Sequence, residues 1–207
     1  MRDPRPLAPE EVALLTDRTL FAIKARVQAQ VRASLDALRV PLAEACRTMP
    51  LAAPAGFDSD KFQLVKGEHL EDCPYQYLDA PKYFAEGTAF TFRSLVWWGH
   101  HAVFAWLLEG EGLVRHKRAM LARYQELAGR DLCLGIAPGL WEWKVGAGFT
   151  LPLEVGNRTQ VAAVLDRRTS LKVCRVVPLD EPALVAGRLA DVGMAAFRAL
   201  LPVVCAE

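Results

Sequence analysis

The chain has 207 residues, and its 25 Lys and Arg side chains nearly balance 24 Asp and Glu side chains, for a formal net charge of +1. This balance gives no electrostatic reason to expect nucleic acid or an anionic membrane as a partner. Hydrophobic residues make up 52% of the sequence, which is typical of a folded globular chain rather than a disordered one. A chain of this length can bury roughly 70% of its unfolded surface without a metal or disulfides.

Five cysteines are spread along the chain, and none belongs to a CxxC pair. Because their number is odd and their spacing is wide, we predict neither a disulfide framework nor a metal site, and we expect no cofactor. The stretch MRDPRPLAPEE at the start has no apolar core of signal-peptide length. The longest apolar run, 94–108, is interrupted in its middle and is too short to cross a bilayer. We therefore expect a cytoplasmic protein.

Two helices are predicted in the first quarter of the chain. A short one over 9–15 begins with a proline and two glutamates, which suit the positive end of the helix dipole. A long amphipathic helix follows from Thr16 or Asp17 to near Cys46, with Pro41 expected to kink it. The apolar residues expected to face the core recur at steps of three and four: Leu20, Ile23, Val27, Val31, Leu35 and Leu38.

The Pro- and Ala-rich segment 48–58 is predicted to be a connector. It divides a helical N-terminal part, 1–47, from a part with sheet and helices, 59–207. At this length we expect both parts to form a single domain, 1–207.

Short stretches of alternating apolar and polar residues predict strands after the connector. Helices are expected at 113–129 and 159–167, and a C-terminal helix is expected to begin near Asp180. This order predicts an α+β fold, with a central antiparallel β-sheet, helices packed on it, a long N-terminal helix and a C-terminal helix. The predicted strands are 61–68, 74–80, 89–98, 101–109, 131–136, 141–145 and 171–177.

The stretch AFTFRSLVWWGHHAVFAWLLEGEG, residues 89–112, predicts a hairpin in the middle of the sheet. Glycine at the first position of a two-residue loop, Gly99-His100, suits a type II′ turn. This pairing places Arg93 across from Trp106. Both faces of the hairpin are largely apolar, so we expect it to be covered on both sides.

Arg93 is the one charge inside this hairpin. An isolated buried charge would cost several kcal/mol, so the guanidinium must be paired or stacked. In a structural interpretation it stacks on Trp106 and pairs with a carboxylate such as Glu109, Asp79 or Glu142. In a functional interpretation it holds the carboxylate or phosphate of a ligand.

Aromatic residues extend the ligand hypothesis. In WEW, 141–143, the two tryptophans would share one face of a strand, and aromatic side chains beside a polar group can stack on a planar ligand. The alternative is that these tryptophans are simply packed. The candidate ligand-binding residues are Arg93, Tyr77, Asp79, Trp106, Trp141 and Glu142.

Histidines support a weaker catalytic hypothesis. His100 and His101 lie at the predicted turn and, since histidine titrates near neutrality, could act as general acid or base with Glu68 or Asp79 as orienting partner. The alternative is a solvated His100 and a packed His101. The sequence has no phosphate-binding loop, nucleophile elbow, HExxH or EF-hand motif.

Three segments together resemble a group of uncharacterised bacterial proteins of about this length: KGE (66–68), PYQYLDAP (74–81) and FRSLVWWG (92–99). The resemblance covers roughly residues 20–155, and FRSLVWWG is its most specific part. It implies a similar order of elements, with an N-terminal helix, a KGE strand and an FR…WWG hairpin. It implies no activity, because the group has no established function.

Three hypotheses for function follow. The first is a non-catalytic accessory or interaction protein, which forms a homo-oligomer through its long amphipathic helix or binds a protein partner. The second is a binder of a small anionic or planar ligand at Arg93 and the aromatic residues. The third is an enzyme that uses a histidine with an acidic partner, so whether the chain is an enzyme stays open. No nucleic acid and no membrane is expected as a partner.

Overall fold

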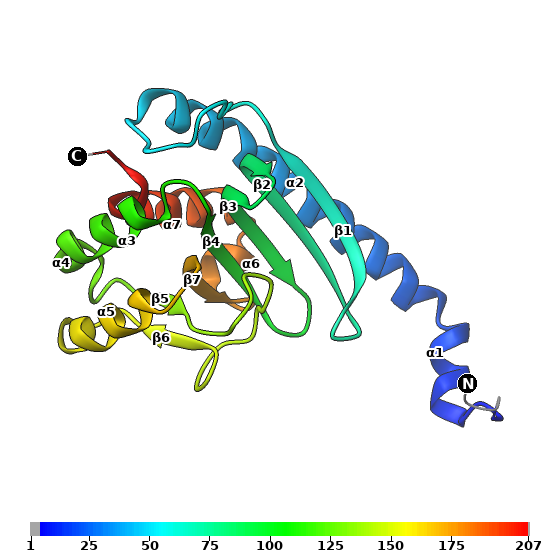
Figure 1. The fold of residues 1–207 in the computed structure, drawn as a ribbon. Helices are drawn as coiled ribbons and strands as arrows, with labels where there is room; N and C mark the ends of the chain where they lie inside the picture. Colours follow the sequence, from blue (N-terminus) through cyan, green and yellow to red (C-terminus); the bar gives the residue numbers. More distant parts are fainter. Residues whose placement is uncertain (1–4, 207) are drawn as a thin grey trace.

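One antiparallel sheet organises the chain in the computed structural model, which describes residues 5–206 (Figure 1). Its strand order is β1-β2-β3-β4-β7-β5-β6, so the first four strands form a meander and β7 pairs with β4. The predicted α+β fold with a central antiparallel sheet is confirmed. The strands are β1 (Gln63–Leu70), β2 (Cys73–Ala85), β3 (Thr88–Trp97), β4 (His101–Glu109), β5 (Leu132–Gly135), β6 (Thr150–Pro152) and β7 (Ser170–Pro178).

The long N-terminal helix and the C-terminal helix are also confirmed. Asp17 begins the long helix, because its Oδ1 accepts a hydrogen bond of 2.9 Å from the backbone N–H of Leu20. The helix then continues past Pro41 to Thr48. The helices are α1 (Pro9–Thr16), α2 (Arg18–Thr48), α3 (Leu113–Ala122), α4 (Tyr124–Leu127), α5 (Arg158–Asp166), α6 (Pro182–Val185) and α7 (Leu189–Val204), with a 3-10 turn η1 (Val155–Asn157).

Helices α2, α3 and α7 pack on one face of the sheet and enclose the larger core. Figure 1 shows α2 running along β1 and β2, with α7 behind the sheet. The C-terminal half of α2 buries Leu35, Leu38 and Leu42 in this core. The helical N-terminal part and the sheet therefore share one hydrophobic core.

The opposite face of the sheet carries a smaller core and, among residues 5–206, no long helix. The segment between β5 and β6, residues 136–149, covers it and buries Leu140 and Trp143 against the sheet. Both hairpin strands are buried on this face as well, as expected from their apolar residues. We call residues 136–149 the covering segment.

The β3–β4 hairpin has a three-residue loop, which corrects the predicted two-residue turn. Trp97 pairs with His101, and residues 98–100 form the loop. Gly99 has a φ of +73°, a left-handed conformation that glycine adopts without strain. A three-residue loop with glycine in this conformation is a common alternative to the type II′ turn.

Because of this shift of one residue, each side chain of β4 lies on the opposite face of the sheet from the one predicted. Arg93 pairs with Ala105, while Trp106 pairs with Phe92 and lies on the helix-covered face. The predicted contact between Arg93 and Trp106 is therefore wrong. The side-chain period of a strand is two, so a slip of one residue moves every side chain to the other face.

Three other expected elements differ. Residues 141–145 form no strand, since they lie in the covering segment, where Trp143 is buried and Trp141 is exposed without a strand partner. The helix expected over 113–129 is divided at Arg123 into α3 and α4. The C-terminal helix begins at Leu189 rather than near Asp180. No helix in the described part of the chain is long and apolar enough to cross a membrane.

Candidate functional site

Arg93 forms a buried ion pair with Asp79, which lies directly opposite it on β2. The Nε and Nη2 atoms of Arg93 donate to the two carboxylate oxygens of Asp79, each over 2.7 Å. The side chains are 8% and 1% exposed. Such a two-point pair satisfies both charges, so the interpretation in which Arg93 pairs with a protein carboxylate is confirmed.

Aromatic rings surround the guanidinium on its other sides. Its central carbon lies 3.8 Å from the ring centroid of Tyr77, 4.9 Å from that of Trp141 and 5.6 Å from that of Trp143. These distances are typical of cation–π contacts. Burial raises the pKa of the Tyr77 phenol, which keeps this group neutral beside the ion pair.

A small pocket of about 220 Å³ opens beside this cluster. It is smaller than the roughly 300–1,000 Å³ of most ligand sites. Because Asp79 already neutralises Arg93, the pocket offers little net positive charge to an anion, whereas its rings could stack on a planar group. The lining residues are Leu70, Tyr75, Tyr77, Arg93, Leu95, Trp141 and Trp143.

The other two proposed ligand-binding residues lie away from this pocket. Trp106 is fully buried on the helix-covered face, with its ring centroid 5.5 Å from that of Phe92. Glu142 accepts a hydrogen bond of 2.9 Å from the backbone N–H of Lys144 and does not line the pocket. The structure thus brings together Arg93, Asp79, Tyr77 and Trp141 only.

The candidate catalytic residues are not brought together. His101 is buried, and its Nε2 lies 3.0 Å from the carbonyl oxygen of Trp143. The ring of His100 stacks on that of Trp97, with 3.6 Å between the ring centroids. Glu68 on β1 instead accepts hydrogen bonds from α2, from Lys24 over 2.5 Å and from Gln28 over 2.9 Å.

Burial lowers the pKa of His101, which favours its neutral form as a donor to that carbonyl. Among the described residues, no hydrogen bond joins His100 or His101 to Glu68 or Asp79. The arrangement therefore lacks the histidine–carboxylate contact that a general base needs for orientation.

A further surface lies on α1 and the first half of α2, the long amphipathic helix for which the sequence suggests self-association. We call residues 9–34 the arm; the structure describes all of them, and none is buried. Figure 1 shows α1 and the start of α2 extending beyond the edge of the sheet, while the rest of the arm runs along β1. Its exposed apolar side chains, 38–62% exposed, are Val12, Leu14, Leu15, Leu20, Phe21, Ile23 and Val27.

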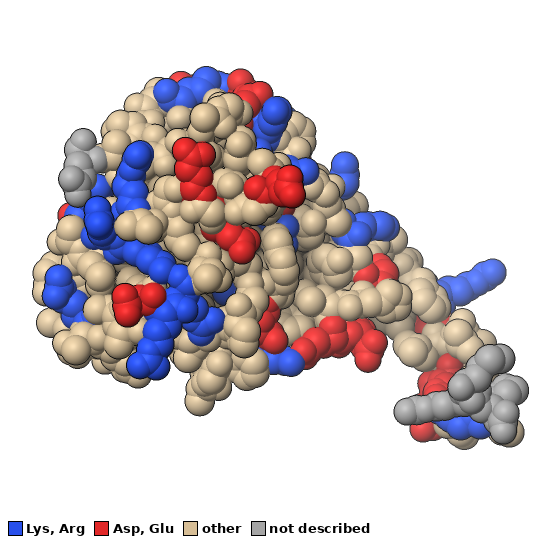
Figure 2. Space-filling model, in the orientation of Figure 1, with Lys and Arg blue, Asp and Glu red and all other residues tan. Residues whose placement is uncertain are grey.

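Charge is divided along the arm. Residues 9–17 contain three acidic residues and no basic one, whereas residues 18–34 contain four basic residues and no acidic one. On the rest of the face in Figure 2, a band of Lys and Arg side chains lies at the left, and most Asp and Glu side chains lie nearer the centre. The acidic residues are Glu10, Glu11 and Asp17, and the basic residues are Arg18, Lys24, Arg26 and Arg32.

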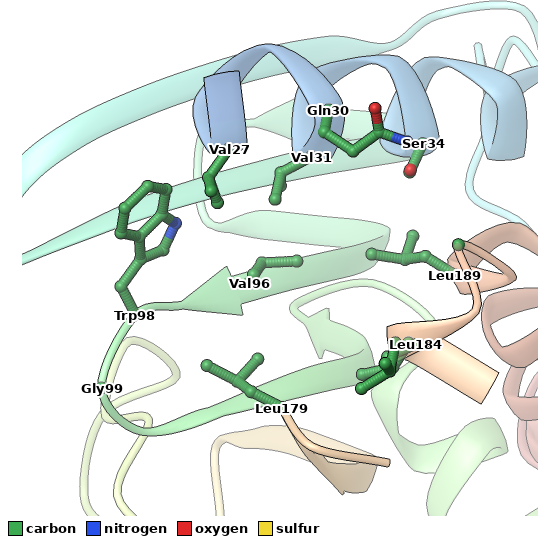
Figure 3. Close-up of a pocket in the computed structure, with 12 residues that line it drawn as sticks. Val27, Gln30, Val31, Ser34, Val96, Trp98, Gly99, Leu179, Leu184 and Leu189 are labelled. Carbon is green, nitrogen blue, oxygen red and sulfur yellow. The ribbon is translucent and has the colours of Figure 1, made fainter. Parts of the chain in front are cut away.

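An apolar groove of about 540 Å³ lies at the base of the arm. In Figure 3, Val27 and Val31 of α2 point toward Val96 and Trp98, and Leu184 and Leu189 close the groove on the side of α6 and α7. Val27 belongs both to the exposed apolar side chains of the arm and to the lining of the groove.

Comparison with known proteins supplies no relative, because no family model, no curated protein and no solved structure matches the chain. The functional proposal consequently depends on the geometry of the arm, the groove and the Arg93 pocket.

Proposed function

We propose that this chain is a non-catalytic, cytoplasmic interaction protein that associates with a second copy of itself through the arm and the groove. The observation that carries the proposal is the exposed apolar surface of the arm. Large exposed apolar patches mark interaction sites in soluble proteins. An isolated helix as short as α1, eight residues, is also only marginally stable in water, so the arm gains stability when a partner covers it.

The groove supplies a surface that fits the arm of another copy. A short amphipathic helix can place apolar side chains three residues apart into an apolar groove, and Val12 and Leu15 of α1 have this spacing. Both are exposed, at 45% and 62%. We propose that α1 of each copy occupies the groove of the other.

Charge complementarity favours the same arrangement. Within the chain, Glu11 already pairs with Arg5 and Lys24 with Glu68. An α1 helix lying in the partner's groove would bring the remaining acidic residues of the arm beside the arginines in the first half of the partner's α2. Opposite charges placed in this way direct the orientation of association and speed the encounter. The contact is reciprocal, as a two-fold dimer requires, and we expect it to bury more than about 1,000 Å².

Sedimentation velocity tests the proposal with three forms of the full chain. We expect the wild type to sediment as a dimer and the variant Val12→Glu/Leu15→Glu to sediment as a monomer. The control Val114→Glu replaces a valine of α3 that is equally exposed, at 61%, but lies outside both surfaces, so it should remain dimeric. A monomeric wild type, or a double variant that dimerises like the wild type, would overturn the proposal.

A second candidate function is the binding of a small planar ligand in the Arg93 pocket. It is favoured by Trp141, which is 53% exposed although its ring lies 4.9 Å from the guanidinium carbon of Arg93 and lines the pocket. Native mass spectrometry of the protein purified from its own host tests it. A retained mass that disappears in Trp141→Ala supports the ligand, and the bare chain mass in the wild type opposes it.

A further inference from the structure

Two cysteines face each other across neighbouring strands of the sheet. Cys133 of β5 pairs directly with Cys174 of β7, and their sulfur atoms are 3.2 Å apart. Directly opposed residues on antiparallel strands have Cβ atoms about 4.5–5.5 Å apart, close to the roughly 3.5–4.5 Å found in disulfides. A bond between the two sulfurs therefore needs only a small adjustment of the strands.

The surroundings give the two thiols different reactivity. Cys133 is partly exposed, whereas Cys174 is 2% exposed, so a reagent reaches Cys133 first. The hydrogen bond with Cys174 and the positive charge of Lys172 lower the pKa of Cys133. The same hydrogen bond, together with burial, raises the pKa of Cys174. Cys133 is thus the more accessible of the two thiols, and the lowered pKa favours its thiolate, the reactive form of cysteine.

Lys172 is held beside the pair by the covering segment. Its Nζ donates to the carbonyl oxygen of Leu140 over 3.3 Å and also to that of Glu142. Gly135 makes room for this side chain, since a Cβ atom at Gly135 would lie 2.5 Å from Cε of Lys172. The position of the positive charge is therefore fixed by β5, β7 and the covering segment together.

We propose that Cys133 and Cys174 are a site of reversible oxidation, at which a hydroperoxide converts the dithiol into an intramolecular disulfide. The thiolate sulfur of Cys133 attacks one peroxide oxygen, so an S–O bond forms and the O–O bond breaks, and the leaving oxygen takes up the proton that Cys133 released and departs as water (or an alcohol). The Cys174 sulfur then attacks the sulfenic sulfur of Cys133, so the S–S bond forms and the S–O bond breaks, and the sulfenic oxygen takes up the proton of Cys174 and departs as water. The two thiols lose two electrons, and the peroxide accepts them.

The Cys133–Cys174 disulfide would restrain the covering segment. Cys133 lies on β5, which leads directly into residues 136–149, the segment that carries Trp141 and Trp143 over Arg93. A covalent bond from β5 to β7 would tie the start of this segment to the sheet.

Thiol counting on the intact, full-length chain tests the site. The protein is treated with hydrogen peroxide, denatured, alkylated without reductant and weighed by mass spectrometry. We expect five alkylated thiols before treatment and three after it, with a peptide map that joins Cys133 to Cys174. Dithiothreitol should restore all five.

Two variants make the outcome specific. Cys133→Ser should keep all four of its remaining thiols after the same treatment, whereas Cys46→Ser, which removes a buried cysteine outside the pair, should still lose two. Five thiols in the treated wild type, a bridge to another cysteine, or sulfinic acid at Cys133 without a bridge would overturn the proposal.

Discussion

Buried charges attach the covering segment to the sheet. The Arg93–Asp79 pair lies under Trp141 and Trp143, and Lys172 lies 4.7 Å from the ring centroid of Trp143. Burial lowers the pKa of Lys172, and the carbonyl groups that accept its hydrogen bonds belong to the covering segment. These polar contacts take the place of the helices that cover the other face.

Removal of one partner of the ion pair is expected to be costly. Asp79→Ala should lower the free energy of unfolding by about 3–5 kcal/mol, because it leaves a buried guanidinium unpaired. Arg93→Met should cost less than Arg93→Ala, since methionine keeps the packing of the aliphatic stem. Urea denaturation measures all three, and equal losses in the two Arg93 variants would contradict this reasoning.

Two buried histidines should make stability depend on pH. Burial lowers the pKa of His101 and of His116 from the ordinary value of 6.5. Below about pH 6.5 the unfolded chain therefore binds more protons than the folded chain. The free energy of unfolding consequently decreases as the pH is lowered. We expect a lower melting temperature at pH 5.5 than at pH 7.5, and a smaller difference in His101→Gln/His116→Gln. An equal difference in both proteins would refute the role of these histidines.

Sequence reasoning identified Arg93 as a charge that needs a partner but could not choose among its three candidate carboxylates. The choice depends on the register of β2 and β3, in which Asp79 pairs with Arg93 beyond a bulge between Asp79 and Lys82 that no local pattern indicates. The predicted face of Trp106 is wrong for a different reason: the Gly99 loop has three residues rather than two, which shifts the register of β3 and β4 by one.

At the scale of the element, the two halves of α2 differ in their surroundings, because the second half is buried in the core and the first half is mostly exposed. Its 31 residues span about 46 Å. All of its buried residues lie in the second half, whereas the first half contacts β1 through side chains such as Lys24 and Gln28. The apolar stripe is continuous in the sequence, so all of it was predicted to face the core. Leu35 and Leu38 do so, but Leu20, Ile23 and Val27 are exposed. A periodic pattern shows that a helical face will be covered, and it does not show by which chain.

The crossing of α2 and α7 depends on a glycine. A Cβ atom at Gly193 would lie 2.5 Å from Cδ2 of Leu38 and 3.0 Å from Cε1 of Phe104. Gly193→Ala should therefore lower the free energy of unfolding by about 1–3 kcal/mol, because the extra methyl group overpacks the core. Gly156→Ala is the matched control, since nothing lies within 4 Å of its Cβ position. Equal melting temperatures for the two variants would contradict the close packing.

At the scale of the whole molecule, the fold has one face covered by helices, one covered by a segment without helices, and an arm that extends past the sheet (Figure 1). The sheet with helices packed on it followed from the sequence, since alternation and helical periodicity are local signals, but the covering segment did not, because its residues 141–145 were predicted to be a strand. The groove did not, because its walls come from α2, the β3–β4 loop and the segment around α6 and α7, which are far apart in the chain.

The central claim is that two copies exchange their α1 helices, and a mixing experiment tests it most directly. One variant, Val12→Glu/Leu15→Glu, has an altered α1 and an intact groove; the other, Val27→Glu/Val185→Glu, has an altered groove and an intact α1. Sedimentation velocity should show each variant alone as a monomer and their equimolar mixture as a dimer weaker than the wild type, because one of the two exchanged contacts is restored. A mixture that stays monomeric while the wild type dimerises would contradict the exchange.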